Sequence, residues 1–172
     1  ADWEQDVLSA IRTQGHYFYP QLRTKIINEG WAAYWHERVM RRLFEQQALS
    51  AEEHGYYAQY HAAVLAENKF VLNPYRVGKT IFEDIKMRWD KGRHGKQWLL
   101  WNNAGEPGQW DTGDRRGEEK IFSVRRVYTD RMLLEQFLTD ELVDELALYI
   151  YRERKTLDGG KELVIAERRP GI

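Results

Sequence analysis

Hydrophobic positions recur every three or four residues between Tyr17 and Phe44, in the longest helical pattern of the chain. These positions are Ile26, Ile27, Ala33, Tyr34, Val39, Met40, Leu43 and Phe44. The mixed spacing predicts a helix that is buried on more than one side. Pro20 suits the first turn of a helix, where its missing N–H is not needed. We therefore expect one long central helix from Pro20 to Phe44.

A shorter amphipathic pattern precedes the central helix. Asp2 is placed to cap it, and apolar residues from Trp3 to Ile11 form a stripe that ends near Gly15. The aromatic cluster at residues 16–20 follows directly. Because aromatic side chains bury large apolar areas, this cluster favours a buried hinge between the two helices.

Capping residues mark the helices that follow. Ser50 with Glu53 forms a capping box and predicts a helix over residues 51–66. Asn73 before Pro74 predicts a cap for a helix over residues 75–90. That helix carries an apolar stripe typical of a core face, at Val77, Ile81, Ile85 and Trp89.

Helical spacing returns at Glu118 and continues to about Asp130. Asp130 and Thr139 are residue types that cap helices, and each precedes a short apolar-periodic run. Residues 147–168 alternate between apolar and polar around Asp158-Gly159-Gly160, which predicts a β-hairpin.

Residues 92–118 contain six glycines around three tryptophans and show no helical period. A loop of this length is uncommon unless it acts as a lid, binds a ligand or becomes ordered against a partner. Together the patterns predict a mainly α fold: a helical bundle around a long central helix, with a long Gly/Trp-rich loop and a C-terminal β-hairpin. At 172 residues we expect a single domain over 1–172.

Composition excludes several classes of function. The 26 basic and 27 acidic residues give a net charge of −1, so no overall field attracts nucleic acid. The chain has no cysteine, which excludes disulfides and Cys-ligated zinc. No apolar run approaches the roughly 20 residues that a membrane span needs, and no signal peptide opens the chain, so we expect a cytoplasmic protein.

Candidate chemistry lies on the central helix. At 100° per residue Glu29 and His36 share one face, with Ala32 and Ala33 between them. The alanines and Gly30 leave a shallow groove that another element or a ligand can approach closely. About 10 Å separates the two reactive residues along the axis, so Glu29 is the better metal ligand and His36 the better substrate contact. The alternative is a hydrogen-bonded buried carboxylate and a core histidine.

The run Tyr-Phe-Tyr-Pro at 17–20 is followed by Asn-Glu-Gly-Trp-Ala-x-x-Trp-His. This resembles the SpoVR family, the stage V sporulation protein R-like proteins, whose motif is matched at Asn28, Glu29, Gly30, Trp31, Ala32, Trp35 and His36. The likeness continues at His61, over 73–91, and in KIFSVRRVYTD and FLTDELVDELALYIY. It covers nearly the whole chain except 92–118 and the last dozen residues.

The resemblance implies a role in sporulation, in spore cortex formation, and assigns no reaction. It also implies a longer protein, with a His-rich segment upstream of this chain and a small α/β portion downstream. In a site shared with the upstream histidines, Glu29 would be one ligand of a divalent metal such as zinc. The chain alone would then be inert.

Two functions from different classes stay open. One is a metal-dependent hydrolase-like site, with Glu29 as metal ligand or general base and His36 orienting water or substrate. Four further residues would contact the substrate or support this site: Asn28, His61, Asn73 and Tyr75.

The alternative is a non-catalytic scaffold in sporulation or stress response, which docks a protein partner through Trp98, Leu99 and Trp101 of the 92–118 loop. An open polar cavity lined by Glu29 and His36 would favour the catalytic site. Burial of both groups beneath the tryptophans of the motif, Trp31 and Trp35, would favour the scaffold.

Overall fold

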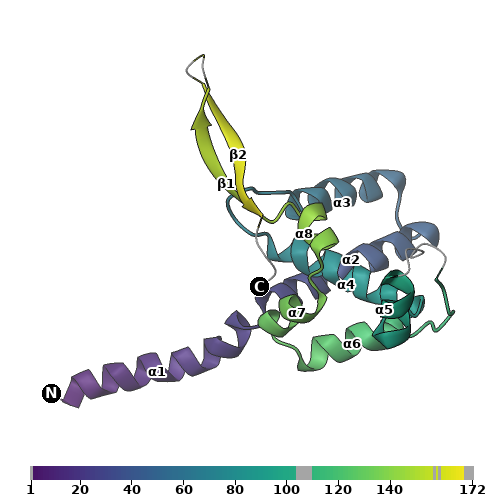
Figure 1. Cartoon of the computed structure of the whole chain (residues 1–172). Coiled ribbons are helices and arrows are strands. Elements are labelled where there is room, and N and C mark those ends of the chain that lie inside the picture. The colour runs from purple at the N-terminus through teal and green to yellow at the C-terminus, as the bar shows by residue number, and fades with distance from the viewer. Residues whose placement is uncertain (1, 104–109, 157, 159, 169–172) are drawn as a thin grey trace.

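The fold consists of eight helices and a two-stranded antiparallel hairpin within the described residues, 2–103, 110–156, 158 and 160–168 of a computed structural model (Figure 1). The elements are α1 (Asp2–Leu22), α2 (Lys25–Glu45), α3 (Ala51–Val64), α4 (Pro74–Asp90), α5 (Gly95–Asn103), α6 (Gly117–Val127), α7 (Asp130–Phe137), α8 (Asp140–Glu145), β1 (Tyr149–Lys155) and β2 (Lys161–Arg168). The prediction of a mainly α fold with a C-terminal hairpin is confirmed.

The core lies where α2, α4 and α6 meet and is closed by α7 and α8. Its fully buried side chains include Ile27, Tyr34, Val77, Ile81, Phe82, Ile85, Ile121, Val124 and Leu133. The predicted stripe of α4 therefore faces the core. Its last member, Trp89, packs against the edge of the core.

Two glycines let the backbones of α2 and α4 touch. A Cβ atom added to Gly30 would lie 2.3 Å from the Cα atom of Gly78. One added to Gly78 would lie 2.3 Å from the carbonyl oxygen of Ile26. Only glycine fits at either position. The close approach of another element at Gly30, which the sequence predicted, is therefore present. The element that approaches there is α4.

The central helix begins later than predicted. Pro20 lies within the last turn of α1, which continues to Leu22, and α2 begins at Lys25. The chain bends at Arg23 and Thr24. The aromatic cluster at 16–20 is consequently an exposed part of α1, and the prediction of a buried hinge there is wrong.

A distant carboxylate fixes the start of α2. Asp130 accepts hydrogen bonds from the backbone N–H groups of Ile26 and Ile27, at 2.9 and 3.0 Å. Its own N–H donates to the carbonyl oxygen of Arg23. Thr129, rather than Asp130, caps α7 by accepting from the N–H of Met132. The prediction that Asp130 caps its own helix is therefore corrected.

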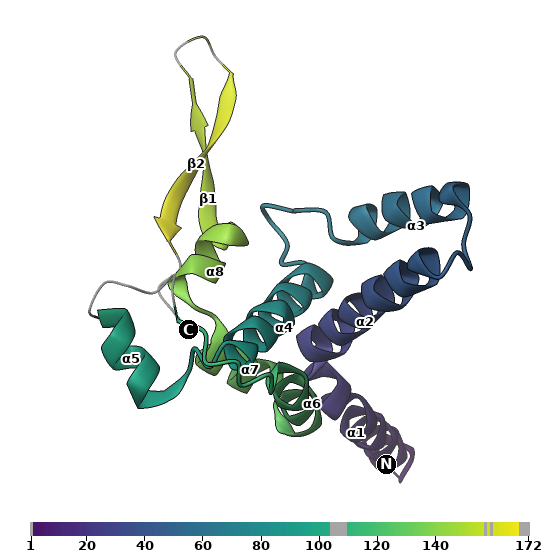
Figure 2. The same cartoon turned by 90° about the vertical axis from the view of Figure 1, so that its right-hand side faces the viewer.

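Three other predicted caps are confirmed. Ser50 and Glu53 form the capping box of α3, and Thr139 caps α8. The Asn73 side chain accepts from two N–H groups of the first turn of α4. From the capped end at Ser50, α3 returns alongside α2 (Figure 2).

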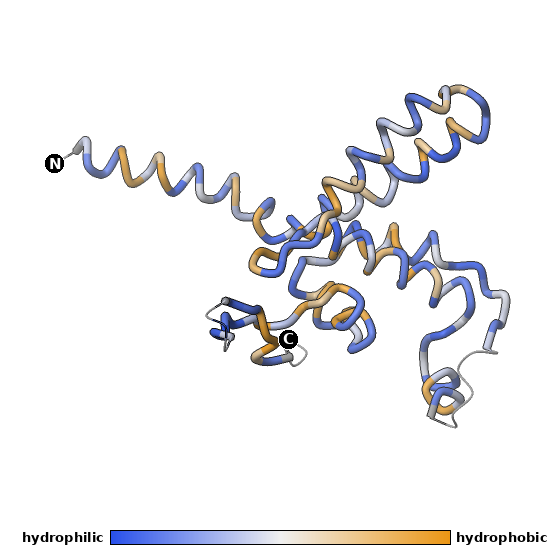
Figure 3. The backbone as a smooth tube through the Cα atoms, turned by 90° about the horizontal axis from the view of Figure 1, so that it is seen from above, coloured by the Kyte–Doolittle hydropathy of each residue, from blue (hydrophilic) through white to orange (hydrophobic). Residues whose placement is uncertain are grey.

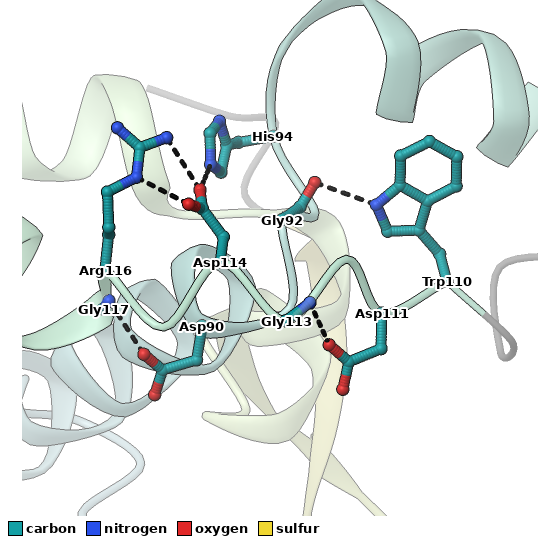
Figure 4. Close-up of polar contacts among 9 residues, drawn as sticks. All are labelled: Asp90, Gly92, His94, Trp110, Asp111, Gly113, Asp114, Arg116 and Gly117. Carbon is teal, nitrogen blue, oxygen red and sulfur yellow. Dashed lines mark hydrogen bonds and ion pairs between the residues drawn. The ribbon is translucent and has the colours of Figure 1, made fainter.

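Residues 92–118 are not wholly loop, because α5 occupies 95–103 and α6 begins at Gly117. The described parts are tied down by local polar contacts (Figure 4). The Trp110 indole donates to the carbonyl oxygen of Gly92 at 2.9 Å, and the N–H of Gly117 donates to the Asp90 carboxylate at 2.8 Å. The predicted unbroken loop is thus corrected to a helix flanked by anchored segments.

Two elements project from the body: α1 on one side and the β1–β2 hairpin on another (Figure 1). Figure 3 shows hydrophobic positions spaced along the projecting α1. All described side chains of α1 are exposed, including Trp3, Leu8, Ile11, Phe18 and Leu22. The strands pair with Tyr151 opposite Ile165, and the register shifts between Ile150 and Tyr151. No helix among the described residues is long and apolar enough to span a membrane.

Candidate functional site

A groove of about 270 Å³ opens between α2, α3 and the start of α4. We call it the α2–α3 groove, and it is lined by Ala32, Ala33, His36, Tyr57, Tyr60, His61, Val64 and Tyr75. The two alanines form its floor because their short side chains leave room above α2. Aromatic rings and two imidazoles form its walls.

The imidazoles of the groove converge on one tyrosine. The Tyr57 ring centre lies 5.1 Å from that of His36 and 5.2 Å from that of His61. Tyr57 Oη and His61 Nε2 are buried, and neither has a hydrogen-bond partner within the described residues. A buried polar group without a partner costs about 1–3 kcal/mol. Both residues line the groove, and these two polar groups are left unsatisfied by the described residues.

An ion-pair network lies behind His61. Lys79 Nζ is 2.8 Å from Glu37 Oε2 and 2.9 Å from Glu83 Oε1, and Glu37 Oε2 is 3.7 Å from His61 Nε2. Burial alone would raise the pKa of Glu37, but the hydrogen bond and charge of Lys79, aided by Arg41, hold this pKa below its usual value. Glu37 is thus ionised at neutral pH and faces the imidazole.

The same surroundings keep His61 uncharged. Burial lowers the pKa of His61 below its ordinary value of 6.5, and the positive charge of Lys79 lowers it further, while Glu37 opposes both effects. A neutral imidazole beside a carboxylate can accept a proton near pH 7.

Glu29 reaches the groove only through Tyr75. Tyr75 lines the groove, and its phenol is hydrogen-bonded to the Glu29 carboxylate, which raises the pKa of Tyr75 above 10.0. The phenol therefore stays protonated at neutral pH. Glu29 and His36 both project from α2, but the Glu29 carboxylate is bonded to Tyr75 and does not itself line the groove.

Two of the predicted residues make their polar contacts outside the groove. The Asn28 amide donates to Thr24 Oγ1 at 3.0 Å, at the junction of α1 and α2. The Asn73 amide donates to the carbonyl oxygens of Val64 and Ala66, while its oxygen caps α4. Neither asparagine lines the groove.

The described residues do not by themselves fit a metal. Among them, no group of three or more His, Asp or Glu side chains is arranged to hold a metal ion. Lys79 also occupies the space beside Glu37 and His61 that a cation would take. Glu29 as a ligand of zinc stays a prediction that needs histidines from outside these residues.

The two tryptophans of the motif lie on another side of α2. Trp31 packs edge-on against Trp35 and against Phe122 of α6, at ring-centre distances of 5.6 and 4.9 Å, and the Trp35 ring is tilted against Phe122 at 5.8 Å. They do not cover His36, which is exposed. The groove is open, as the catalytic alternative requires, but aromatic and apolar rather than polar.

Sequence reasoning missed Tyr57, Glu37 and Lys79 as parts of the site. A signal existed for Glu37, which directly follows His36 and can pair with cations four residues away. The sequence contains no such signal for Tyr57 and Lys79, because α3 and α4 meet α2 only in the folded chain.

Comparison with known proteins gives a relative of undetermined function. The chain is 24% identical over 153 residues to the uncharacterized protein YcgB of Escherichia coli (strain K12). The match covers 86% of this chain and 28% of the relative, so the chain spans less than a third of that protein's length. No solved structure matches.

A family model described as SpoVR like protein matches residues 1–168. The match includes residues 92–118 and eight of the last twelve residues, both of which lie outside the motif resemblance. This chain belongs to the SpoVR-like protein family.

Proposed function

We propose that the protein acts in the cytoplasm during sporulation, in spore cortex formation, and that the α2–α3 groove binds its ligand and accepts a proton from it. Membership of the SpoVR-like family supports the biological role. One observation carries the chemistry: His61 Nε2 and Tyr57 Oη are buried in one groove without a hydrogen-bond partner in the described part of the chain.

The proton acceptor in this proposal is His61. The carboxylate of Glu37 lies 3.7 Å from Nε2, beyond hydrogen-bond distance, so Nε2 is left to accept a proton from a bound hydroxyl group or water. The same carboxylate then stabilises the imidazolium. Separations such as the 3.7 Å between Glu37 and His61 commonly shorten when a ligand binds.

The remaining residues hold the ligand. His36 is exposed at the rim of the groove and contacts the ligand directly. Tyr75 donates its proton to Glu29 and so presents its lone pairs to a donor on the ligand. Glu29 acts here as a positioning residue for Tyr75.

The test compares two histidines of α3 in the full-length protein, expressed in a spore-forming bacterium that depends on it. His61 lines the groove, whereas His54 stacks on Phe44 at 4.1 Å, outside it. We expect His61→Gln to abolish normal cortex and His54→Gln to preserve it. Equal phenotypes of the two variants would refute the role of the groove. Metal analysis of the full-length protein beside Glu29→Gln tests zinc separately.

A second candidate function is partner docking by α5, supported by the exposure of Leu99 and Leu100, at 57% and 73%. The three tryptophans nearby are poorer probes, because Trp98 and Trp101 pack on Trp110. Docking predicts that Leu99→Ser with Leu100→Ser blocks sporulation while His61→Gln does not. The reverse pattern would exclude it.

A further inference from the structure

A second cavity, of about 520 Å³, lies on the C-terminal half of α2. We call it the arginine cavity, because Arg38, Arg41 and Arg42 line it together with Trp35 and Glu45. It shares no lining residue with the α2–α3 groove. Trp35 is the one motif residue in its described lining, and the function proposed above gives this cavity no role.

The charges in the arginine cavity are unbalanced. Of the described residues that line it, three are cationic and one, Glu45, is anionic. Arg41 is paired with Glu37 at 2.6 Å, and Arg38 stacks over the Tyr34 ring at 4.1 Å. Arg42 makes no ion pair with any described residue. At least one guanidinium charge is therefore left without a carboxylate.

Two hydrogen-bond donors in the cavity lining are also unsatisfied. Trp35 Nε1 and Arg38 Nε are buried and have no acceptor among the described residues. Both groups donate and cannot accept. A ligand that satisfies them must carry acceptor atoms.

The helix dipole explains the position of only one of these unpaired groups. Arg42 lies in the last turn of α2, where a cation is stabilised. Trp35 and Arg38 lie about two to three turns before the end of α2 at Glu45, beyond that effect. The arginines near α5 provide a contrast, because Arg116 is paired with Asp114 at 2.7 Å and Arg93 donates to the Trp110 carbonyl oxygen.

We propose that the arginine cavity binds the phosphoryl group of a small phosphorylated molecule. A tetrahedral dianion accepts hydrogen bonds from several directions, and guanidinium groups match its geometry with paired N–H donors. A planar carboxylate carries half the charge and fewer acceptor positions. Nucleic acid is disfavoured because the chain has a net charge of −1 and the three arginines occupy one short stretch of helix.

The indole N–H of Trp35 provides a direct probe. In ¹⁵N-labelled protein its resonance is assigned by its loss in Trp35→Phe. Inorganic phosphate and glycerol 3-phosphate are then titrated at constant ionic strength, beside acetate and chloride. We expect a saturable shift of the indole resonance with both phosphate probes and no saturable shift with acetate or chloride. The ratio of the affinities for inorganic phosphate and glycerol 3-phosphate then tells whether the cavity prefers free phosphate or a phosphate ester.

The matched variants are Arg42→Gln and Arg126→Gln. Both arginines lie in the last turn of a helix and both are exposed, but Arg126 lies on α6, away from the cavity. We expect at least a tenfold loss of phosphate affinity in Arg42→Gln and none in Arg126→Gln. Equal affinities, or a shift that acetate and chloride reproduce, would overturn the proposal. Arg42-dependent binding of an oligonucleotide or anionic vesicles without binding of either phosphate probe would also overturn it.

Discussion

Replacing Gly30 by alanine tests the contact between α2 and α4 most directly. In an exposed helix this substitution stabilises by about 0.5–1 kcal/mol, because alanine loses less backbone entropy on folding. In the folded chain the new Cβ atom would lie 2.3, 2.4 and 2.8 Å from Gly78 Cα, Gly78 C and Lys79 N. All three are backbone atoms, so no side chain can rotate away.

Relief of this overlap requires α2 and α4 to separate by roughly 1 Å, which loosens the packing of Ile27, Tyr34 and Ile81 between them. Overpacking of this kind costs about 1–3 kcal/mol, and the absence of a flexible neighbour favours the upper end. After subtraction of the propensity gain, we expect Gly30→Ala to lower the free energy of unfolding by about 2 kcal/mol. The melting temperature would fall by about 4–8 °C for a chain of this size.

Gly15 and Gly55 are matched controls, because they lie within α1 and α3 and a Cβ atom at either would meet nothing within 4 Å. Urea and thermal unfolding followed by circular dichroism should show Gly15→Ala and Gly55→Ala to be slightly more stable than the parent chain. Gly30→Ala should shift in the opposite direction. A Gly30→Ala chain as stable as the controls would refute the close approach of the two helices.

Three further outcomes are expected. Asp130→Ala removes both side-chain hydrogen bonds to the first turn of α2, so it should lower the free energy of unfolding by about 1–2 kcal/mol. Urea denaturation measures this change. An unchanged midpoint would show that α2 needs no cap from α7. The pKa of His61 is lowered in the folded state, so the unfolded chain binds the proton more tightly. The free energy of unfolding should therefore decrease as the pH falls below 6.5. In His61→Gln this decrease should be smaller between about pH 7 and 5. Glu37, whose pKa is also lowered, adds a loss of stability only as the pH falls below 4.5. Trp110→Ala removes the bond to Gly92 and the ring contacts to α5, so limited proteolysis should cleave near α5 faster while the global melting temperature changes little.

Local signals in the sequence predicted the elements whose ends are fixed locally. The Ser50–Glu53 box and the caps at Asn73 and Thr139 use partners within three residues, and each lies where expected. The start of α2 depends on Asp130, 103 and 104 residues away from the N–H groups that it binds. No local pattern around Pro20 contains that information, so the predicted helix began too early.

The part of the candidate site that lies on one helix was predictable, and the part that depends on distant segments was not. Helical periodicity placed Glu29, His36 and two alanines on one side of α2, and Gly30 indicated a close approach. The partners of these residues come from α3 and α4, and helical periodicity cannot show that Tyr75 bonds to Glu29 or that Glu29 does not line the groove. A single domain over residues 1–172 stays a prediction.

The groove has one stiff wall and one compliant wall. Direct backbone contact at Gly30 and Gly78 locks α2 to α4, whereas no residue of α3 is buried. Asn73 fastens only the far end of α3, through Val64 and Ala66. Because α3 buries no residue, its amide hydrogens should exchange well before those of α2 and α4.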